Sequence, residues 1–396
     1  MHTRPIILCS LITITACGPL TPISRDGGTG GGSASGGGTA TGGSGGGVSG
    51  GGGGSGGGVT GGGAATGGGG ASGGGGGAPN FSWVRMTFSP GPTNPATTFT
   101  VRGLARRPNG ELFVTLNNGE IYRAAASSNQ LTRLPNVPAQ TGSTLLGPIG
   151  AFGQDVIVFR GSSAHFCTGA CTDFNDFNPL HTLTFPEEPS AICASDAAAF
   201  VTTNAGSTGK LGKIERGTML TYTEVAANAG VGNVEKCQVG ANGDVFVAGD
   251  SAVAVLLAGG GLGSETVDLM GQPGSSWRDV ATRAASGFLV GGGSGFRSAT
   301  RASAAWTSLM PDTSGTVLTS VAMLSETEAL AGGIVNSGSS TTPGILRWNG
   351  VRFAPFTPAP PVFEVEHAVT VSANEVYFAG YERTSGGYVI VHGTRP

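Results

Sequence analysis

Carboxylates that lie close together in the sequence are the first residues to test for acid–base chemistry. Glu187 and Glu188 are adjacent after Pro186, and Glu364 and Glu366 alternate along an extended run. A glycoside hydrolase needs two carboxyl groups that converge on one bond, one of them as a proton donor. Neighbouring side chains on a loop diverge, and we expect the alternating pair to lie on a solvated strand face. The sequence therefore assigns no catalytic residue.

Metal and nucleotide motifs are equally hard to find. The histidines that follow the N-terminal segment, His165, His181, His367 and His392, include no close pair and no HExxH motif. The segment Gly206–Lys210 resembles part of a phosphate-binding loop, but it lacks the first glycine and the Ser or Thr that binds magnesium. The sequence predicts no metal site and no cofactor, and it predicts structural roles for the single histidines.

The N-terminal segment has the pattern of an export signal. Residues 1–16 carry Arg4 and then an apolar run that ends in small residues and is too short to cross a bilayer. Residues 14–17 (ITAC) resemble a bacterial lipoprotein box, in which cleavage precedes the cysteine and its sulfur is acylated. The resemblance implies palmitate-type lipidation of Cys17 and stable anchoring to a membrane. An ordinary signal peptide with an incidental cysteine is the alternative.

Residues 17–79 are predicted to hold the lipidated cysteine and a flexible tether. Between Gly27 and Gly77, 33 of 51 residues are glycine. Such a segment cannot bury enough apolar surface to offset the entropy of ordering, so we expect a disordered linker. Gly18, rather than Asp, after the cysteine resembles lipoproteins sent to the outer membrane. We therefore expect a bacterial cell-envelope protein, on the outer rather than the inner membrane, with its ordered domain in the periplasm or at the cell surface.

The charge of the chain argues against nucleic-acid binding. The sequence has 21 basic and 24 acidic residues, a net charge of −3, and no basic cluster. Binding to nucleic acid needs a concentrated positive face, so we expect no nucleic-acid partner.

A repeated unit organises residues 80–396. Short apolar runs recur beside turn residues such as Asn242-Gly243, a strong hairpin signal. Their anchor positions are Leu112, Val156, Ala199, Val245, Phe288, Ala329 and Val376. Successive anchors are 41 to 47 residues apart. A period of about 40–50 residues with several short strands is typical of β-propeller blades.

The repeats predict an all-β fold, a seven-bladed β-propeller of four-stranded blades. The last unit ends with a third strand at 387–392, and residues 82–88 have the pattern of a fourth strand without a unit of its own. We expect this N-terminal strand to complete the last blade and close the ring, which removes exposed sheet edges. A pair of β-sandwiches is the alternative, but it does not explain seven similar steps.

The repeat pattern of residues 81–396 resembles the broad bacterial group of WD-repeat-like, YVTN-like and BNR-like propellers. The WD dipeptide and the Ser-x-Asp-x-Gly-x-Thr-Trp box are missing, and Gly332-Gly333 lacks the aromatic residues that follow in Kelch repeats. The resemblance therefore implies a fold and no role for any single residue.

Four cysteines remain after the predicted signal and anchor. Pairing is the default in an exported protein. Cys167 and Cys171 enclose a short loop with Gly169, which predicts a disulfide. Cys193 and Cys237 fall on inner strands of consecutive blades, where a cross-blade disulfide and two buried free thiols both remain open. The spacing of the four is poor for a zinc site.

We expect a monomeric, non-enzymatic interaction module that presents one face of the ring to a protein or polysaccharide partner. Propellers usually bind at the face that carries the loops between second and third strands and between blades. Candidate residues in those loops are Arg160, Lys210, Asp250, Trp277, Arg278, Arg297, Glu382 and Arg383. The alternative is an envelope enzyme, a hydrolase or lyase acting on glycans, with acids from several blades at the axial mouth. The sequence does not identify the partner.

Overall fold

The computed structural model describes residues 80–93, 100–138, 146–184, 187–216, 220–250, 252–265, 267–268, 277–291, 297–302, 304–309, 316–335, 344–382 and 386–396. The predicted signal peptide, Cys17 and the predicted tether lie outside these ranges. Within them, we find no helix with the length and apolar character that crossing a membrane requires.

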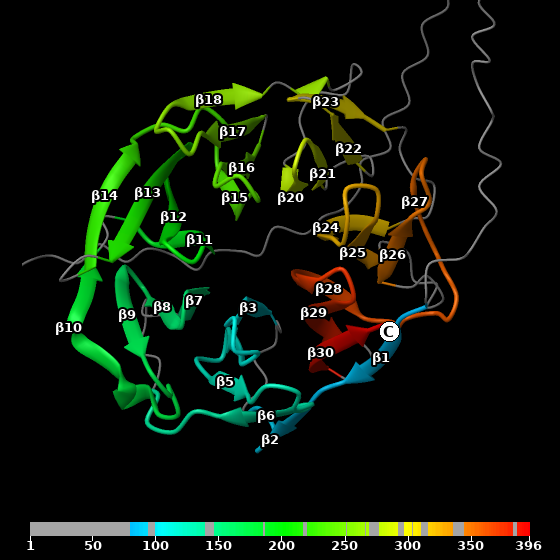
Figure 1. The fold of residues 1–396 in the computed structure, drawn as a ribbon. Helices are drawn as coiled ribbons and strands as arrows, with labels where there is room; N and C mark the ends of the chain where they lie inside the picture. Colours follow the sequence, from blue (N-terminus) through cyan, green and yellow to red (C-terminus); the bar gives the residue numbers. More distant parts are fainter. Residues whose placement is uncertain are drawn as a thin grey trace, which may run out of the picture. The chain divides into compact units, whose positions relative to one another are not determined.

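Residues 80–396 form seven sheets arranged as a ring, and we number the blades from the sheet that begins with β3 (Figure 1). Blade 1 contains β3 (Val101–Arg106), β4 (Leu112–Leu116), β5 (Ile121–Ala124), β6 (Gln130–Arg133) and β2 (Thr87–Ser89). Blade 2 contains β7 (Leu146–Phe152), β8 (Asp155–Arg160), β9 (Ser163–Thr168) and β10 (Phe177–Thr184), preceded by the 3₁₀ turn η1 (Phe174–Asp176). Blade 3 contains β11 (Pro189–Ala194), β12 (Ala198–Ala205), β13 (Thr208–Arg216) and β14 (Leu220–Ala226).

The other blades repeat this order from the axis outward. Blade 4 contains β15 (Val234–Val239), β16 (Val245–Gly249), β17 (Val253–Leu256) and β18 (Leu262–Glu265). Blade 5 contains β20 (Trp277–Arg283), β21 (Ser286–Gly291), β22 (Arg297–Ala302), β23 (Ala305–Ser308) and β19 (Val267–Asp268). Blade 6 contains β24 (Thr316–Met323), β25 (Ala329–Val335), β26 (Ile345–Trp348) and β27 (Phe353–Ala354). Blade 7 contains β28 (Glu364–Ser372), β29 (Glu375–Glu382), β30 (Gly387–Thr394) and β1 (Ser82–Arg85).

The predicted all-β, seven-bladed propeller is confirmed, and every predicted anchor lies on the second strand of a blade. These strands are apolar along their length because each is covered by neighbouring blades on both faces; β4 and β16 are buried at every residue. The predicted turn before β16 is also present. Gly243 has a φ of 87°, in the left-handed region, and its N–H donates to the Gly240 carbonyl at 2.9 Å.

Ring closure brings the two ends of the ordered domain together in blade 7. β1 pairs antiparallel with β30, with Ser82 opposite Thr394 and Arg85 opposite Val391 (Figure 1). The prediction that an N-terminal strand completes the last blade is therefore confirmed. The closing segment at 82–88 is two strands rather than one. After Met86 the chain continues as β2, which pairs in parallel with β6 of blade 1.

The C-terminal residues reinforce this closure. Arg395 donates hydrogen bonds from its two terminal nitrogens to the two oxygens of Glu328 in blade 6, each at 2.7 Å. Its guanidinium also lies 4.9 Å from the centre of the Phe81 ring, a cation–π distance. The residues on either side of the closing strand pair are thus attached to blade 6 and to each other.

The predicted pair, Cys167 and Cys171, and the pair left open, Cys193 and Cys237, both lie in disulfide geometry. The Cα atoms of Cys167 and Cys171 are 5.9 Å apart, and those of Cys193 and Cys237 are 5.6 Å apart, with the sulfurs bonded in each pair. The second pair joins β11 to β15, the inner strands of blades 3 and 4. The structure therefore favours the cross-blade disulfide over two free thiols.

Replacing both Cys193 and Cys237 by alanine is expected to lower the free energy of unfolding by about 4 kcal/mol. The same change at Cys167 and Cys171 is expected to cost about 2 kcal/mol, because the chain-entropy cost of a closed loop grows with its length. The sequence separations are 44 and 4 residues. Urea denaturation of the two double variants checks this, and an equal loss in both would contradict it.

Candidate functional site at the ring axis

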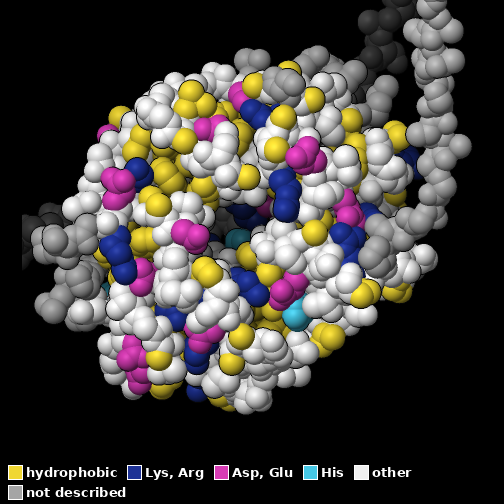
Figure 2. Space-filling model, in the orientation of Figure 1, with side chains coloured by type: hydrophobic (Ala, Val, Ile, Leu, Met, Phe, Trp, Pro, Cys, Tyr) yellow, Lys and Arg dark blue, Asp and Glu magenta, His cyan; other side chains and the backbone are white. Residues whose placement is uncertain are grey.

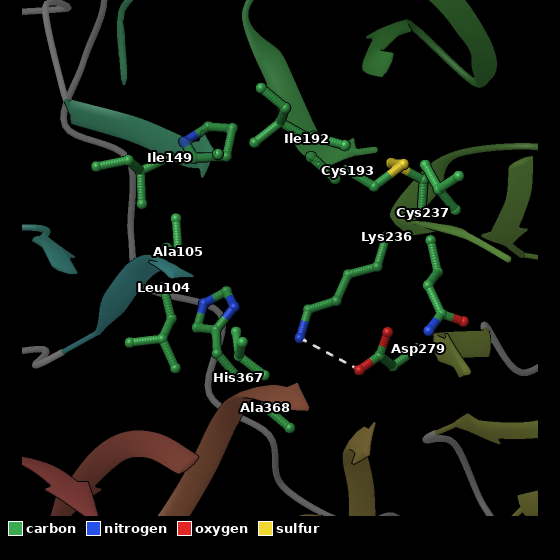
Figure 3. Close-up of a pocket in the computed structure, with 18 of the residues that line it drawn as sticks. Leu104, Ala105, Ile149, Ile192, Cys193, Lys236, Cys237, Asp279, His367 and Ala368 are labelled. Carbon is green, nitrogen blue, oxygen red and sulfur yellow. Dashed lines mark ion pairs between the residues drawn. A yellow bond between two sulfur atoms is a disulfide. The ribbon is translucent and has the colours of Figure 1, made fainter. Parts of the chain in front are cut away.

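The inner strands of the blades surround an axial cavity of about 340 Å³. The space-filling view shows the ring hollowed at its centre, with basic and histidine side chains visible in the hollow (Figure 2). The cavity has two unlike walls. Figure 3 shows Leu104, Ile149 and Ile192 on the wall from blades 1 to 3, and Lys236, Asp279 and His367 on the wall from blades 4, 5 and 7.

A β-bulge at the same place in each inner strand directs these side chains. All seven inner strands shift register against their second strands near their start, for example between Trp277 and Asp279 and between Val365 and His367. A bulge inserts one residue and re-aims the side chains beside it. In blade 7 this places Glu366 and His367 toward the seam with blade 1, and in blade 5 it places Asp279 at the cavity.

Lys236 reaches from blade 4 to blade 7. Its Nζ donates a hydrogen bond to the backbone carbonyl of Glu366 at 2.7 Å and lies 3.7 Å from Oδ2 of Asp279 (Figure 3). An ammonium group has three N–H donors. One of them therefore remains for a ligand in the cavity.

The carboxylate of Asp279 accepts hydrogen bonds from the backbone of two blades. Its Oδ1 accepts the N–H of Val280 at 2.9 Å, and its Oδ2 accepts the N–H of Val321 in blade 6 at 3.0 Å. Burial raises the pKa of Asp279, while the charge of Lys236 and the two N–H groups oppose that rise. This acid therefore links blades 5 and 6.

Glu366 and His367 hold one residue of blade 1. Oε2 of Glu366 accepts the N–H of Val101 at 2.7 Å, and Nε2 of His367 lies 2.8 Å from the Val101 carbonyl oxygen. Because a carbonyl only accepts, Nε2 carries the proton and Nδ1 is an acceptor. Burial raises the pKa of Glu366 to about 7 and lowers the pKa of His367 to about 3. These two side chains therefore connect the last blade to the first through hydrogen bonds to Val101.

The expectation that Glu364 and Glu366 form a solvated strand face is wrong. Glu364 is 6% exposed and Glu366 is half-buried, because an inner strand faces the axis and the adjacent blade. The other predicted pair is not buried in this way. Glu187 accepts a hydrogen bond from Lys210 at 2.6 Å, and Glu188 is exposed.

The predicted loop residues have several different roles. Trp277 is wrongly predicted as a loop residue, since it is 1% exposed and packs in the core between blades 4 and 5. Arg278 is exposed and forms an ion pair with Glu235 at 3.1 Å. Arg160 is half-buried at the end of β8, and Asp250 accepts the N–H of Asn233 at 3.0 Å.

The remaining candidates do not form a common site among the described residues. Glu382 pairs with Arg85 at 2.8 Å, and His392 lies 3.1 Å from Glu375. The His165 ring packs on Phe174 at 5.5 Å between centres. Arg383 and the side chains of His181 and Arg297 lie outside the described residues. In the part of the chain that the structure describes, no group of three His, Cys, Asp or Glu side chains is arranged to hold a metal.

Sequence reasoning missed Lys236, Asp279 and His367 because it sought the site in loops rather than on inner strands. Each of the three lies nine residues before the second-strand anchor of its own blade. The same position is Gly103 in blade 1 and Gly147 in blade 2. Aligning the repeats on their anchors would have placed the three polar residues in one column.

Comparison with known proteins identifies the fold. No protein-family model and no curated protein sequence matches this chain. Virginiamycin B lyase from Staphylococcus aureus is similar in structure over 80% of this chain and 100% of its own, with 12% identity and a TM-score of 0.57. The WD40 repeats of RRP9 cover 81% and 99%, with 12% identity and a TM-score of 0.59. YCF48 bound to a D1 peptide covers 81% and 98%, with 9% identity and a TM-score of 0.56. The chain is a seven-bladed β-propeller whose structural neighbours include a lyase as well as WD40 repeats and a peptide-bound protein.

Proposed function

We propose that this protein is a lipid-anchored, extracytoplasmic binding module. A glycine-rich tether holds the propeller on a bacterial membrane, by preference the outer one, and one face of the ring binds a protein or polysaccharide partner without chemical conversion. The support for the anchor is the sequence pattern at residues 14–17 and the composition of residues 17–79. A closed ring leaves no unpaired end strand between its first and last blades, which favours a monomer.

The binding role rests on how the acids around the axis are used. Asp279 and Glu366 both accept hydrogen bonds from backbone N–H groups of the next blade. Carboxylates that accept such hydrogen bonds join neighbouring blades, and they are not positioned as a pair around one bond of a substrate. The result is a rigid platform, which suits recognition because little has to be ordered on binding. The peptide bound to YCF48 supports a protein as one class of partner.

Glu366 also favours a second candidate function, a glycan-acting envelope hydrolase or lyase. Its pKa of about 7 is where a general acid or base works best at neutral pH. Virginiamycin B lyase shows that a propeller of this kind can be an enzyme. Turnover of an envelope glycan that is lost in Glu366→Gln would favour this function over simple binding.

Cys17→Ala is expected to move the protein from the membrane fraction to the soluble fraction. The reason is that the acyl chains on this sulfur are the proposed anchor. Cell fractionation and immunoblotting measure it, with Cys9→Ala as the control, since Cys9 lies in the predicted signal peptide and that variant should stay on the membrane. Unchanged membrane retention of Cys17→Ala would remove the anchor from the proposal.

Chemical cross-linking of the full chain in the same cells tests whether the propeller binds a partner. Arg278 is one of the predicted binding residues and is exposed at the start of the inner strand of blade 5. Arg278→Glu reverses its charge, so a cross-linked adduct of the wild type should be lost. Lys213→Glu is the matched control, because Lys213 lies on the third strand of blade 3, away from the axis, and its adduct should persist. An adduct that survives both changes would place the partner elsewhere.

A further inference from the structure

The axial cavity is built like a small-molecule site, and its two walls specify the ligand. Its volume of about 340 Å³ falls within the range of about 300–1,000 Å³ that ligand sites occupy. The apolar wall offers Leu104, Ile149 and Ile192 beside the Cys193–Cys237 disulfide (Figure 3). Water at such a wall finds no polar side chain to bind, so an aliphatic group would displace it favourably.

The charged side chains that line the cavity include one cation more than acids: Arg102 and Arg106 come from blade 1 and Lys236 from blade 4, against Glu235 and Asp279. Four of these charged groups are paired: Arg106 with Glu375 at 3.5 Å, Glu235 with Arg278 at 3.1 Å, and Lys236 and Asp279 with each other at 3.7 Å. Arg102 also lines the cavity, is exposed, and forms no ion pair or hydrogen bond among the described residues. A single excess positive charge suits a monoanion better than a phosphate, which would need further cations.

The two cations act at one place. Lys236 Nζ donates to the Glu366 carbonyl at 2.7 Å, and Arg102 directly follows Val101, whose N–H donates to the Glu366 carboxylate at 2.7 Å. Both cations line the cavity, and both oppose the rise in the pKa of Glu366. Their fields therefore overlap where blade 7 meets the cavity. The remaining N–H of Lys236 can donate a hydrogen bond to an acid group placed there.

We infer that the cavity binds a compact amphipathic carboxylate, with its acid group on Lys236 and Arg102 and its aliphatic body against Leu104, Ile149 and Ile192. This goes beyond the proposed binding of a macromolecule to the ring face and does not depend on it. Binding requires no covalent step and no cofactor.

Isothermal titration calorimetry of the full-length protein with N-acetyl-L-leucine tests the inference, because this probe joins a carboxylate to a branched aliphatic group. N-acetyl-L-leucinamide, which lacks the charge, is expected to bind at least about tenfold more weakly. N-acetylglycine, which lacks the aliphatic group, is expected to bind weaker by a similar factor. Equal affinity for the acid and its amide, or no heat with the acid at millimolar concentration, would overturn the inference.

Variants locate the site. Lys236→Met keeps the apolar stem and removes the charge, and Arg102→Gln removes the second cation at an exposed position; each is expected to weaken the acid at least about fivefold. Lys213→Gln is the control, because this cation lies on the third strand of blade 3 and does not line the cavity, so the affinity of this variant should stay within about twofold. If Lys236→Met fails to fold, the affinity of Arg102→Gln alone tests where the acid group binds. Unchanged binding in Arg102→Gln contradicts the assignment.

Discussion

Phe81→Ala is expected to lower the free energy of unfolding by about 3–5 kcal/mol, the usual range for truncating a fully buried phenylalanine. Phe81 is 1% exposed and precedes the strand that closes the ring. Its ring stacks on Trp83 at 5.4 Å, lies under the guanidinium of Arg395, and packs in a cluster with Phe363 and Phe378. Truncation would leave a cavity at the closure and release both chain ends.

Urea denaturation gives this loss directly, and Val84→Ala is the control on the same strand. Val84 is 41% exposed, so its truncation should cost well under about 1 kcal/mol. If Phe81→Ala cost no more than Val84→Ala, closure of the ring would contribute little to stability. An intermediate loss in Phe81→Leu would show that the effect follows the volume removed.

Glu366→Gln is expected to stabilise the protein at pH 8 and to change little below pH 4. Burial raises the pKa of Glu366 from its ordinary value of 4.5 to about 7. Between these values the folded protein holds a proton that the unfolded chain has released, so the stability contributed by Glu366 is lost as pH rises through about 7. Above that pH the penalty on the charged carboxylate is about 3 kcal/mol. Glutamine removes the charge and keeps an oxygen for the N–H of Val101.

His367→Gln is expected to stabilise the protein at acidic rather than alkaline pH, because the pKa of His367 is shifted in the opposite direction to that of Glu366. Burial lowers the pKa of His367 from 6.5 to about 3, so below pH 6.5 the unfolded chain binds a proton that the folded protein does not. The stability that depends on neutral His367 is therefore lost as pH falls from 6.5 toward 3. Between pH 4.5 and 6.5 the contribution of Glu366 to the free energy of unfolding falls with rising pH while that of His367 increases. The two partly cancel in the wild type, so its own pH dependence shows neither.

Urea denaturation of the wild type and both variants from pH 4 to pH 8.5 separates the two groups. The difference between Glu366→Gln and wild type should grow from about pH 4.5 to pH 7, and that for His367→Gln should grow as pH falls below 6.5. Glu326→Gln, at an exposed carboxylate that does not line the axial cavity, is the control. Differences that stay constant across the pH range for both variants would refute the assigned burial of this pair.

The fold could be predicted from the sequence because its main elements obey local rules. The second strand of every blade is buried on both faces, so it must be apolar, and the turn beside it needs a residue such as Gly243. These two requirements recur with each blade and set the period. The crossing at Met86 could not be predicted, because β2 is only three residues long and pairs in parallel with the distant strand β6, with Thr87 opposite Gln130.

The axial site was harder to predict for a different reason. Its lining comes from the inner strands of all seven blades, and a bulge rather than a plain alternation decides the direction of the side chains. A strict period of two places Glu364 and Glu366 on the same face, whereas the register shift between Val365 and His367 separates them. Which wall is charged depends on contacts such as that of Lys236 with the Glu366 carbonyl, whose residues come from blades 4 and 7, far apart in the sequence.

The pairing of β1 with β30 has a consequence for how such a chain is made. Ribosomal synthesis produces Ser82 first and its partner Thr394 near the end, so the first strand must wait for almost the whole domain. Contacts between residues so distant in sequence form slowly, because the entropy cost of closing a very long loop comes before the contacts stabilise the fold. During that delay the apolar side chains of Phe81 and Trp83 are open to other molecules, and a chaperone in the compartment where the chain folds would protect them.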